Sequence, residues 1–276
     1  DLDSVAEDEA EDATRLVHRS SALKYPQLVL GMVAIFVYVG VEVSTIANLP
    51  AYLKLPVEQG GLGLETAMIA PFVSLYWASL MIGRWAGAAG AFNAPPTVRW
   101  MLTLLLPYLA FGVFLAVNAI AQYQVSQFLV YGGVIVTMVL ATFASRGNPA
   151  RMLLYFALCG IAALLIGMTT SGMTSVIAFI SVGLFCSIMW PCIFTLAISG
   201  LGRNTGQGSS LLIMMIMGGG LVPLLQGWIV DAYSLHLSFF VGVACFAYLA
   251  FYAVRASSIL RMQGIDLDKL AAKAGH

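Results

Sequence analysis

Charged residues are scarce in this sequence. Lysine and arginine number 13, aspartate and glutamate also number 13, and together they make up 9% of the 276 residues. Soluble domains carry roughly 25% charged residues, so a chain of this composition cannot cover an ordinary water-facing surface. The composition therefore excludes a soluble domain, and with a formal net charge of zero we expect no nucleic-acid partner.

Cysteine and histidine are also few, and no catalytic or metal-binding motif joins them. The sequence contains no CxxC pair, no HExxH, no GxSxG and no P-loop. The cysteines lie inside apolar stretches, where they are typical of packing residues, and the histidines lie outside them and far apart. The sequence predicts no metal, cofactor, disulfide or enzymatic activity. These residues are Cys159, Cys186, Cys192, Cys245, His18, His236 and His276.

Long apolar runs are abundant, and each is long enough to cross a bilayer, which takes about 20 residues. The runs are continuous rather than alternating, so they favour helices over the strands of a membrane barrel. Short connections between the runs predict an antiparallel, all-α bundle of eight membrane-spanning helices. The expected spans are roughly 26–50, 65–91, 98–120, 127–145, 151–170, 173–199, 208–230 and 237–256.

The basic residues predict how this bundle is oriented. Eight spans place both ends of the chain on one side of the membrane, and all the lysines and arginines except Lys54 fall on that side. Positive residues accumulate on the cytoplasmic side of membrane proteins, so this side is expected to be the cytoplasm. A miscount by one span would destroy the asymmetry.

The two ends of the chain differ from the bundle in composition. Residues 1–12 contain seven of the 13 acidic residues, and 1–25 are interpreted as an acidic cytoplasmic linker without a signal peptide. Residues 26–257 form the predicted bundle and 258–276 a cytoplasmic tail. Because no initiator methionine precedes the linker, we interpret the chain as a fragment of a longer protein.

Glu42 is the carboxylate that lies well inside a predicted span. It is about 24 Å from the start of its helix, slightly beyond the bilayer centre. Tyr38, Thr45 and Asn48 lie on the same helix face. In one interpretation Glu42 lines a water-filled path, where it accepts hydrogen bonds from substrate hydroxyls or binds a proton. In the other it is a structural residue hydrogen-bonded between helices.

Other polar and aromatic residues inside the spans are weaker candidates. Arg84, near the cytoplasmic end of its span, is either a gate residue or a snorkelling side chain. Aromatic rings pack against apolar C–H faces and amides pair with hydroxyls, so Trp77, Trp190 and Gln226 are candidate binding residues for a substrate that offers both, as a sugar does. Packing is their alternative role.

Glycine and proline mark positions where the predicted helices could break. Such breaks weaken a helix and often line a substrate cavity in membrane transporters, although tight helix packing is an alternative explanation. The candidate positions are Pro191, Gly218, Gly219, Gly220 and Pro223.

Several stretches resemble one known family. They are LGMVAIFVYVGVEVSTIANLPAYL at 30–53, YWASLMIGRWAG at 76–87, CFAYLAFYA at 245–253, and most specifically the long stretch 183–231, which includes IMWPCIFTLAISGLG and MMIMGGGLVPLLQGW. They are similar to the C-terminal half of the fucose–galactose–glucose:proton symporters of the major facilitator superfamily, over roughly half the chain.

The resemblance implies a twelve-helix fold of two six-helix halves. It implies transport of a hexose or deoxyhexose (glucose, galactose or fucose) by alternating access, coupled to protons, in the inner membrane of a bacterium. The partners implied are the sugar, protons, the lipid bilayer and the N-terminal half of the same transporter. Gly83-Arg84 resembles part of the superfamily's cytoplasmic loop motif.

The sequence departs from this family in three respects. Eight spans exceed the expected six, so the third and fourth are interpreted as an inserted two-helix hairpin. The family's main proton- and sugar-binding carboxylates lie in its N-terminal half, so no residue here inherits them. Cys192 stands where a polar residue is expected after the Trp-Pro pair. A non-transporting sugar sensor or scaffold on the same fold remains the alternative function.

Overall fold

The computed structural model describes residues 21–88 and 96–269, so most of the acidic linker and the last part of the tail lie outside the described residues. The described part is helical and contains no strand. Eight of its helical segments are long and apolar enough to cross a membrane, which confirms the predicted number of spans. The segments are Pro26–Lys54, Thr66–Gly87, Thr97–Ile120, Ser126–Ser145, Pro149–Thr169, Gly172–Ile198, Gly202–Ala232 and Leu235–Met262.

Five of the spans contain one α-helix each, with little interruption. These helices are α2 (Pro26–Lys54), α3 (Ala70–Ala88), α4 (Pro96–Ile120), α5 (Tyr131–Ser145) and α6 (Pro149–Thr169). Short 3₁₀ turns precede α2, α3 and α5, namely η1 (Ala22–Lys24), η3 (Thr66–Met68) and η5 (Ser126–Phe128), and η2 (Val57–Gln59) follows α2.

The last three spans are each divided into shorter pieces. The sixth consists of α7 (Gly172–Cys186) and α8 (Met189–Ile198). The seventh consists of η6 (Gly202–Asn204), α9 (Thr205–Met214), the 3₁₀ turn η7 (Met215–Met217) and α10 (Gly218–Ala232). The eighth consists of α11 (Leu235–Ser238) and α12 (Phe240–Met262).

Local sequence features explain the turn after α5 and the start of α6. Arg146 and Gly147 have positive φ angles of 52° and 74°, so the chain reverses sharply after α5. Asn148 then caps α6, because its side-chain oxygen accepts hydrogen bonds from the backbone N–H groups of Ala150 and Arg151. Pro149 occupies the first turn, where a missing N–H leaves no hydrogen bond unmade.

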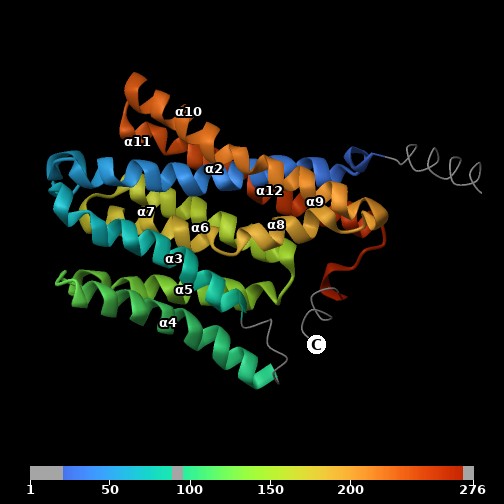
Figure 1. The fold of residues 1–276 in the computed structure, drawn as a ribbon, viewed down its shortest axis with the longest axis horizontal. Helices are drawn as coiled ribbons and strands as arrows, with labels where there is room; N and C mark the ends of the chain where they lie inside the picture. The colour runs from blue at the N-terminus through green and yellow to red at the C-terminus, as the bar shows by residue number, and fades with distance from the viewer. Residues whose placement is uncertain (1–20, 89–95, 270–276) are drawn as a thin grey trace, which may run out of the picture.

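The core of the bundle is centred on α7, in which residues 175–186 are all buried. The helices α2, α3 and α6 pack around α7, and α12 packs against both α2 and α6. Along the lower edge of the view in Figure 1, α4 and α5 lie beside α3 and α6, away from α2 and α10. The start of the described chain (blue) and its end (red) lie at the same end of the bundle.

Candidate functional site

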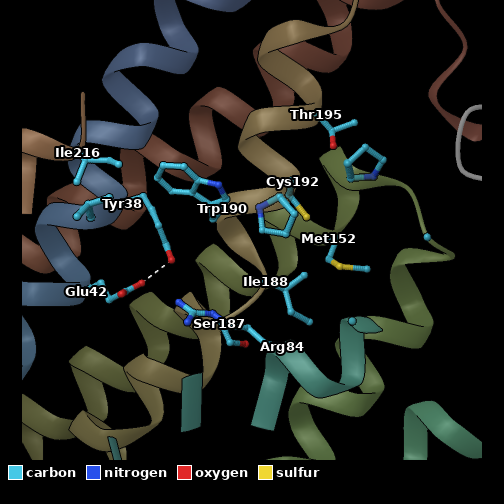
Figure 2. Close-up of a pocket in the computed structure, with 15 residues that line it drawn as sticks. Tyr38, Glu42, Arg84, Met152, Ser187, Ile188, Trp190, Cys192, Thr195 and Ile216 are labelled. Atoms are coloured by element: carbon cyan, nitrogen blue, oxygen red, sulfur yellow. Dashed lines mark hydrogen bonds between the residues drawn. The ribbon is translucent and has the colours of Figure 1, made fainter. Parts of the chain in front are cut away.

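A cavity of about 820 Å³ opens beside the middle of α2 (Figure 2). It is bounded by α2, α3, the start of α6, the junction of α7 and α8, and η7. Its size falls in the range of small-molecule sites. The cavity is lined by Tyr38, Val39, Glu42, Arg84, Gly87, Gly147, Pro149, Met152, Ser187, Ile188, Trp190, Pro191, Cys192, Thr195 and Ile216.

Tyr38 and Glu42 form a hydrogen-bonded pair at the wall of this cavity (Figure 2). They are four residues apart and therefore lie on the same face of α2, where the Tyr38 hydroxyl donates to a Glu42 carboxylate oxygen. The Tyr76 hydroxyl of α3 donates to the Glu42 backbone carbonyl at 2.7 Å. The carboxylate is half-buried, so it is held in place and still reaches the cavity.

Arg84 of α3 lines the same cavity and brings a positive charge to it. Among the described residues it makes no ion pair within 4.0 Å, so its guanidinium is available to a ligand. The preceding residue, Gly83, explains its position: a Cβ there would lie 1.7 Å from the Ser187 side-chain oxygen. Only glycine permits this close approach of α3 to the α7–α8 junction.

The α7–α8 junction supplies the aromatic side of the cavity. The regular helix is interrupted at Ser187 and Ile188, and α8 resumes at Met189 with Trp190 and Pro191 in its first turn. The Trp190 ring lies 6.2 Å from the Tyr38 ring, centroid to centroid, and is tilted by 58°. An indole face and a carboxylate thus line one cavity, and proline in the first turn of α8 costs no helical hydrogen bond.

Two other members of the predicted stripe on α2 do not reach the cavity. The Thr45 hydroxyl donates to the Val41 carbonyl at 2.8 Å, and the Asn48 amide donates to the Ser44 carbonyl at 3.0 Å. Both side chains therefore satisfy their donors on their own helix, and neither lines the cavity.

Trp77 and Gln226 also lie outside the cavity lining. Trp77 is 51% exposed and touches Tyr76 edge to face, with ring centroids 6.1 Å apart. Gln226 is 1% exposed, and its amide donates to the Ser238 hydroxyl at 3.1 Å, which joins α10 to α11. Neither residue is placed by the structure beside Glu42 or Trp190.

The glycine run at 218–220 lies at the start of α10 and packs it against α2. A Cβ at Gly218 would lie 2.0 Å from the Phe36 backbone oxygen, and one at Gly219 would lie 2.9 Å from Val39. A Cβ at Gly220 would meet nothing within 4 Å. Pro223 follows inside α10. The first two glycines thus allow α10 to approach α2 closely, and they bring η7, with Ile216, to the cavity.

The structure adds lining residues that the sequence interpretation did not name. Ser187 and Thr195 each lie four residues from Pro191, which the sequence analysis did name. Helical spacing from Pro191 could therefore have identified both. Gly147 comes from the α5–α6 connection, and Met152 comes from the first turns of α6. Their approach depends on how distant helices pack, and no local pattern signals it.

The chain is similar in sequence to part of several proteins named as sugar transporters. No family model matches it. It is 35% identical over 237 residues to the glucose/galactose transporter of Brucella abortus biovar 1 (strain 9-941), a match that covers 86% of this chain and 44% of the relative. It is 36% identical over 110 residues to the L-fucose-proton symporter of Escherichia coli (strain K12), covering 40% of this chain and 25% of that protein.

A solved structure shares the fold. The chain superposes on FucP, a major facilitator superfamily transporter in the outward conformation, with a TM-score of 0.56 and 23% sequence identity. The superposition covers 84% of this chain and 42% of FucP, and the match lies in the C-terminal part of that protein. The chain thus spans less than half the length of its first relatives. It is therefore similar in sequence to the C-terminal part of glucose/galactose and L-fucose transporters, and it has the fold of one half of a major facilitator superfamily protein.

Proposed function

We propose that the chain is the C-terminal part of a proton-coupled transporter for a hexose or deoxyhexose, which works by alternating access in the inner membrane of a bacterium. The observation that carries the proposal is the cavity in which Glu42, bound by Tyr38, faces the same space as Trp190 and Arg84. The sugar-transporting relatives support the substrate class.

The chemistry of the cavity suits a sugar. A carboxylate accepts hydrogen bonds from sugar hydroxyls, a guanidinium donates them, and an indole face packs against the apolar C–H face of a pyranose. Glu42 is also the membrane-embedded carboxylate that lines the cavity, so we assign it the sugar- or proton-linked role in this half.

The position of the cavity also suits access of the sugar from one side of the membrane. From Glu42 it reaches Arg84, Gly87 and Gly147 near the ends of α3 and α5. The positive-inside rule assigns that end, together with both ends of the chain, to the cytoplasm. In this proposal the N-terminal half of the transporter closes the other wall, and the α4–α5 pair is an insertion outside the transport path.

Glu42→Gln tests the assignment in the complete transporter reconstituted into liposomes. Labelled sugar should accumulate when an inward proton gradient is imposed, and Glu42→Gln should lower the initial uptake rate at least about tenfold because it removes the carboxylate charge from the cavity. The matched control is Glu58→Gln, which removes a carboxylate outside the cavity.

The outcomes separate the parts of the proposal. Full uptake by Glu42→Gln at equal protein abundance would dismiss the role of Glu42. Uptake that ignores the proton gradient would remove the coupling. Sugar binding by the wild type without any flux would favour a sensor on the same fold.

A further inference from the structure

A second cavity, of about 420 Å³, lies between α6 and α12. It occupies the end of the bundle where α6 begins and α12 ends. By the positions of its residues along the two helices, its outer part contains Arg151 and Arg261 and its inner part contains Leu154 and Val254. Ser257 and Ser258 lie between them on α12. The lining residues are Ala150, Arg151, Leu154, Ala253, Val254, Ser257, Ser258, Arg261 and Met262, and we call this site the α6–α12 groove.

The α6–α12 groove and the candidate transport cavity lie on opposite faces of α6. Pro149 and Met152 line the transport cavity, whereas Ala150, Arg151 and Leu154 line the groove. At about 100° per residue, the mean directions of these two sets differ by about 180°. A protein half that closes the transport cavity therefore leaves the groove on the outer, lipid-facing side of the bundle.

The groove changes from apolar to basic along its length. Val254 is 58% exposed, and together with Leu154 it offers an apolar surface at the depth of the membrane interior. Arg151 is the third residue of α6 and Arg261 the second-last of α12, so both lie at the level of the bilayer surface. Hydroxyls and guanidinium groups there can donate to an anionic oxygen.

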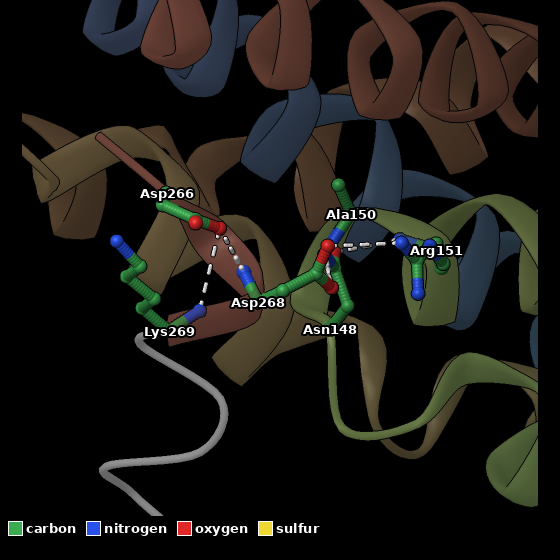
Figure 3. Close-up of polar contacts among 6 residues, drawn as sticks. All are labelled: Asn148, Ala150, Arg151, Asp266, Asp268 and Lys269. Carbon is green, nitrogen blue, oxygen red and sulfur yellow. Dashed lines mark hydrogen bonds and ion pairs between the residues drawn. The ribbon is translucent and has the colours of Figure 1, made fainter. Parts of the chain in front are cut away.

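One acidic side chain contacts a lining residue of this groove. Asp268, in the segment after α12, accepts a hydrogen bond of 2.8 Å from the Asn148 amide and forms an ion pair of 3.0 Å with Arg151 (Figure 3). Both partners of the ion pair are solvent-exposed, so the pair is weak. Arg261 makes no ion pair within 4.0 Å in the described part of the chain. Two cations against one anion leave the groove with a net positive charge.

We propose that the α6–α12 groove binds an anionic glycerophospholipid. Arg151, Arg261 and the hydroxyls of Ser257 and Ser258 hold the headgroup phosphate, and an acyl chain lies along Leu154 and Val254. Basic pockets between membrane helices bind such headgroups, and the apolar part of the groove selects a lipid over a free anion. The inference depends on the membrane fold and is independent of the transported sugar.

The test is native mass spectrometry of the delipidated, purified protein with dioleoylphosphatidylglycerol or dioleoylphosphatidylcholine. Phosphatidylglycerol should bind more tightly than phosphatidylcholine. The double variant R151Q/R261Q should bind phosphatidylglycerol at least about tenfold more weakly, because it loses two charge-assisted contacts. The matched control R203Q/R255Q removes two basic residues that do not line the groove, and it should bind within about twofold of the wild type.

D268N keeps both arginines and separates this proposal from a purely structural role for Arg151. Without the competing carboxylate, phosphatidylglycerol should bind as tightly as to the wild type or more tightly. Weakening in D268N equal to that in R151Q/R261Q would overturn the proposal, because the arginines would then act through the segment after α12. Unchanged binding in R151Q/R261Q, or displacement of the lipid by millimolar inorganic phosphate, would overturn it as well.

Discussion

Two spans of the bundle, α7–α8 and α4, are both strongly apolar yet occupy opposite environments. In the sixth span, Gly172–Ile198, 89% of the most apolar stretch is buried within the protein, against 22% in the third span, Thr97–Ile120. Overall apolarity identifies a membrane helix but does not say whether it faces lipid or protein.

What distinguishes these two helices is the kind of residue on their surfaces. The buried span carries small residues against its neighbours: Gly183 lies against Tyr76, and Ser181 satisfies its hydroxyl on the Ile177 carbonyl at 2.7 Å. The peripheral span exposes large side chains such as Trp100 and Leu109, which are 55% and 58% exposed. Close packing through small residues therefore marks the inner helix.

The largest expected effect comes from the same substitution placed in each helix. A Cβ at Gly183 would lie 2.9 Å from the Tyr76 carbonyl oxygen, whereas a Cβ at Gly112 of α4 meets nothing within 4 Å. Gly183→Val should lower the free energy of unfolding by about 1–3 kcal/mol through overpacking, and Gly112→Val should change it little. Unfolding in mixed detergent micelles measures both. Equal losses would show that helix propensity, not packing, sets the effect.

A pair of tryptophans extends the comparison from protein stability to sugar binding. Trp190 lines the transport cavity, whereas Trp100 stacks on Phe143 at 4.3 Å on the lipid-exposed side. Trp190→Ala should weaken sugar binding by the complete transporter about tenfold, or about 1.4 kcal/mol, through the lost ring face, and Trp100→Ala should leave it unchanged. Isothermal titration measures both affinities. A weaker affinity in Trp100→Ala would place the substrate elsewhere.

The smallest effect is expected for the pH dependence of the Asp268 contact at the start of α6, where the peripheral pair α4–α5 joins the core. The Asn148 hydrogen bond, followed by the charges of Arg151 and Arg261, lowers the pKa of Asp268. Because the folded pKa is depressed, the stabilising contact is complete above the ordinary aspartate pKa of about 3.9 and is lost as the pH falls through the lower folded value.

Hydrogen exchange of residues 264–269 measures this loss. Exchange, corrected for its intrinsic pH dependence, should increase below about pH 4 in the wild type. In Asp268→Asn it should be independent of pH in that range. A pH-dependent increase of the same size in Asp268→Asn would assign the effect to another group.

The number of spans and the all-α fold could be predicted from the sequence, because lipid imposes both length and continuous apolarity on each helix. The similarity to sugar transporters was visible in the Trp190-Pro191 and Gly218–Gly220 stretches. The hairpin interpretation of α4 and α5 stays a prediction, and their place at the edge of the bundle fits it.

The candidate site was only partly predictable. Tyr38, Glu42, Arg84 and Trp190 line one cavity, as polar and aromatic residues inside apolar helices suggested. Thr45 and Asn48 share the helix face of Glu42 but bond to their own backbone. Helical spacing fixes direction around one helix, whereas the neighbours that meet that face depend on contacts far apart in the sequence.

The three-residue turn η7 changes the winding of the seventh span. A 3₁₀ turn advances about 120° per residue instead of about 100°, so Met215–Met217 place α10 about 60° out of phase with α9. One chain segment thus turns one side towards α8 and α2 through α9, and a different side towards α2 through α10. An uninterrupted helical wheel drawn over 205–232 would therefore assign partners wrongly at one of its ends.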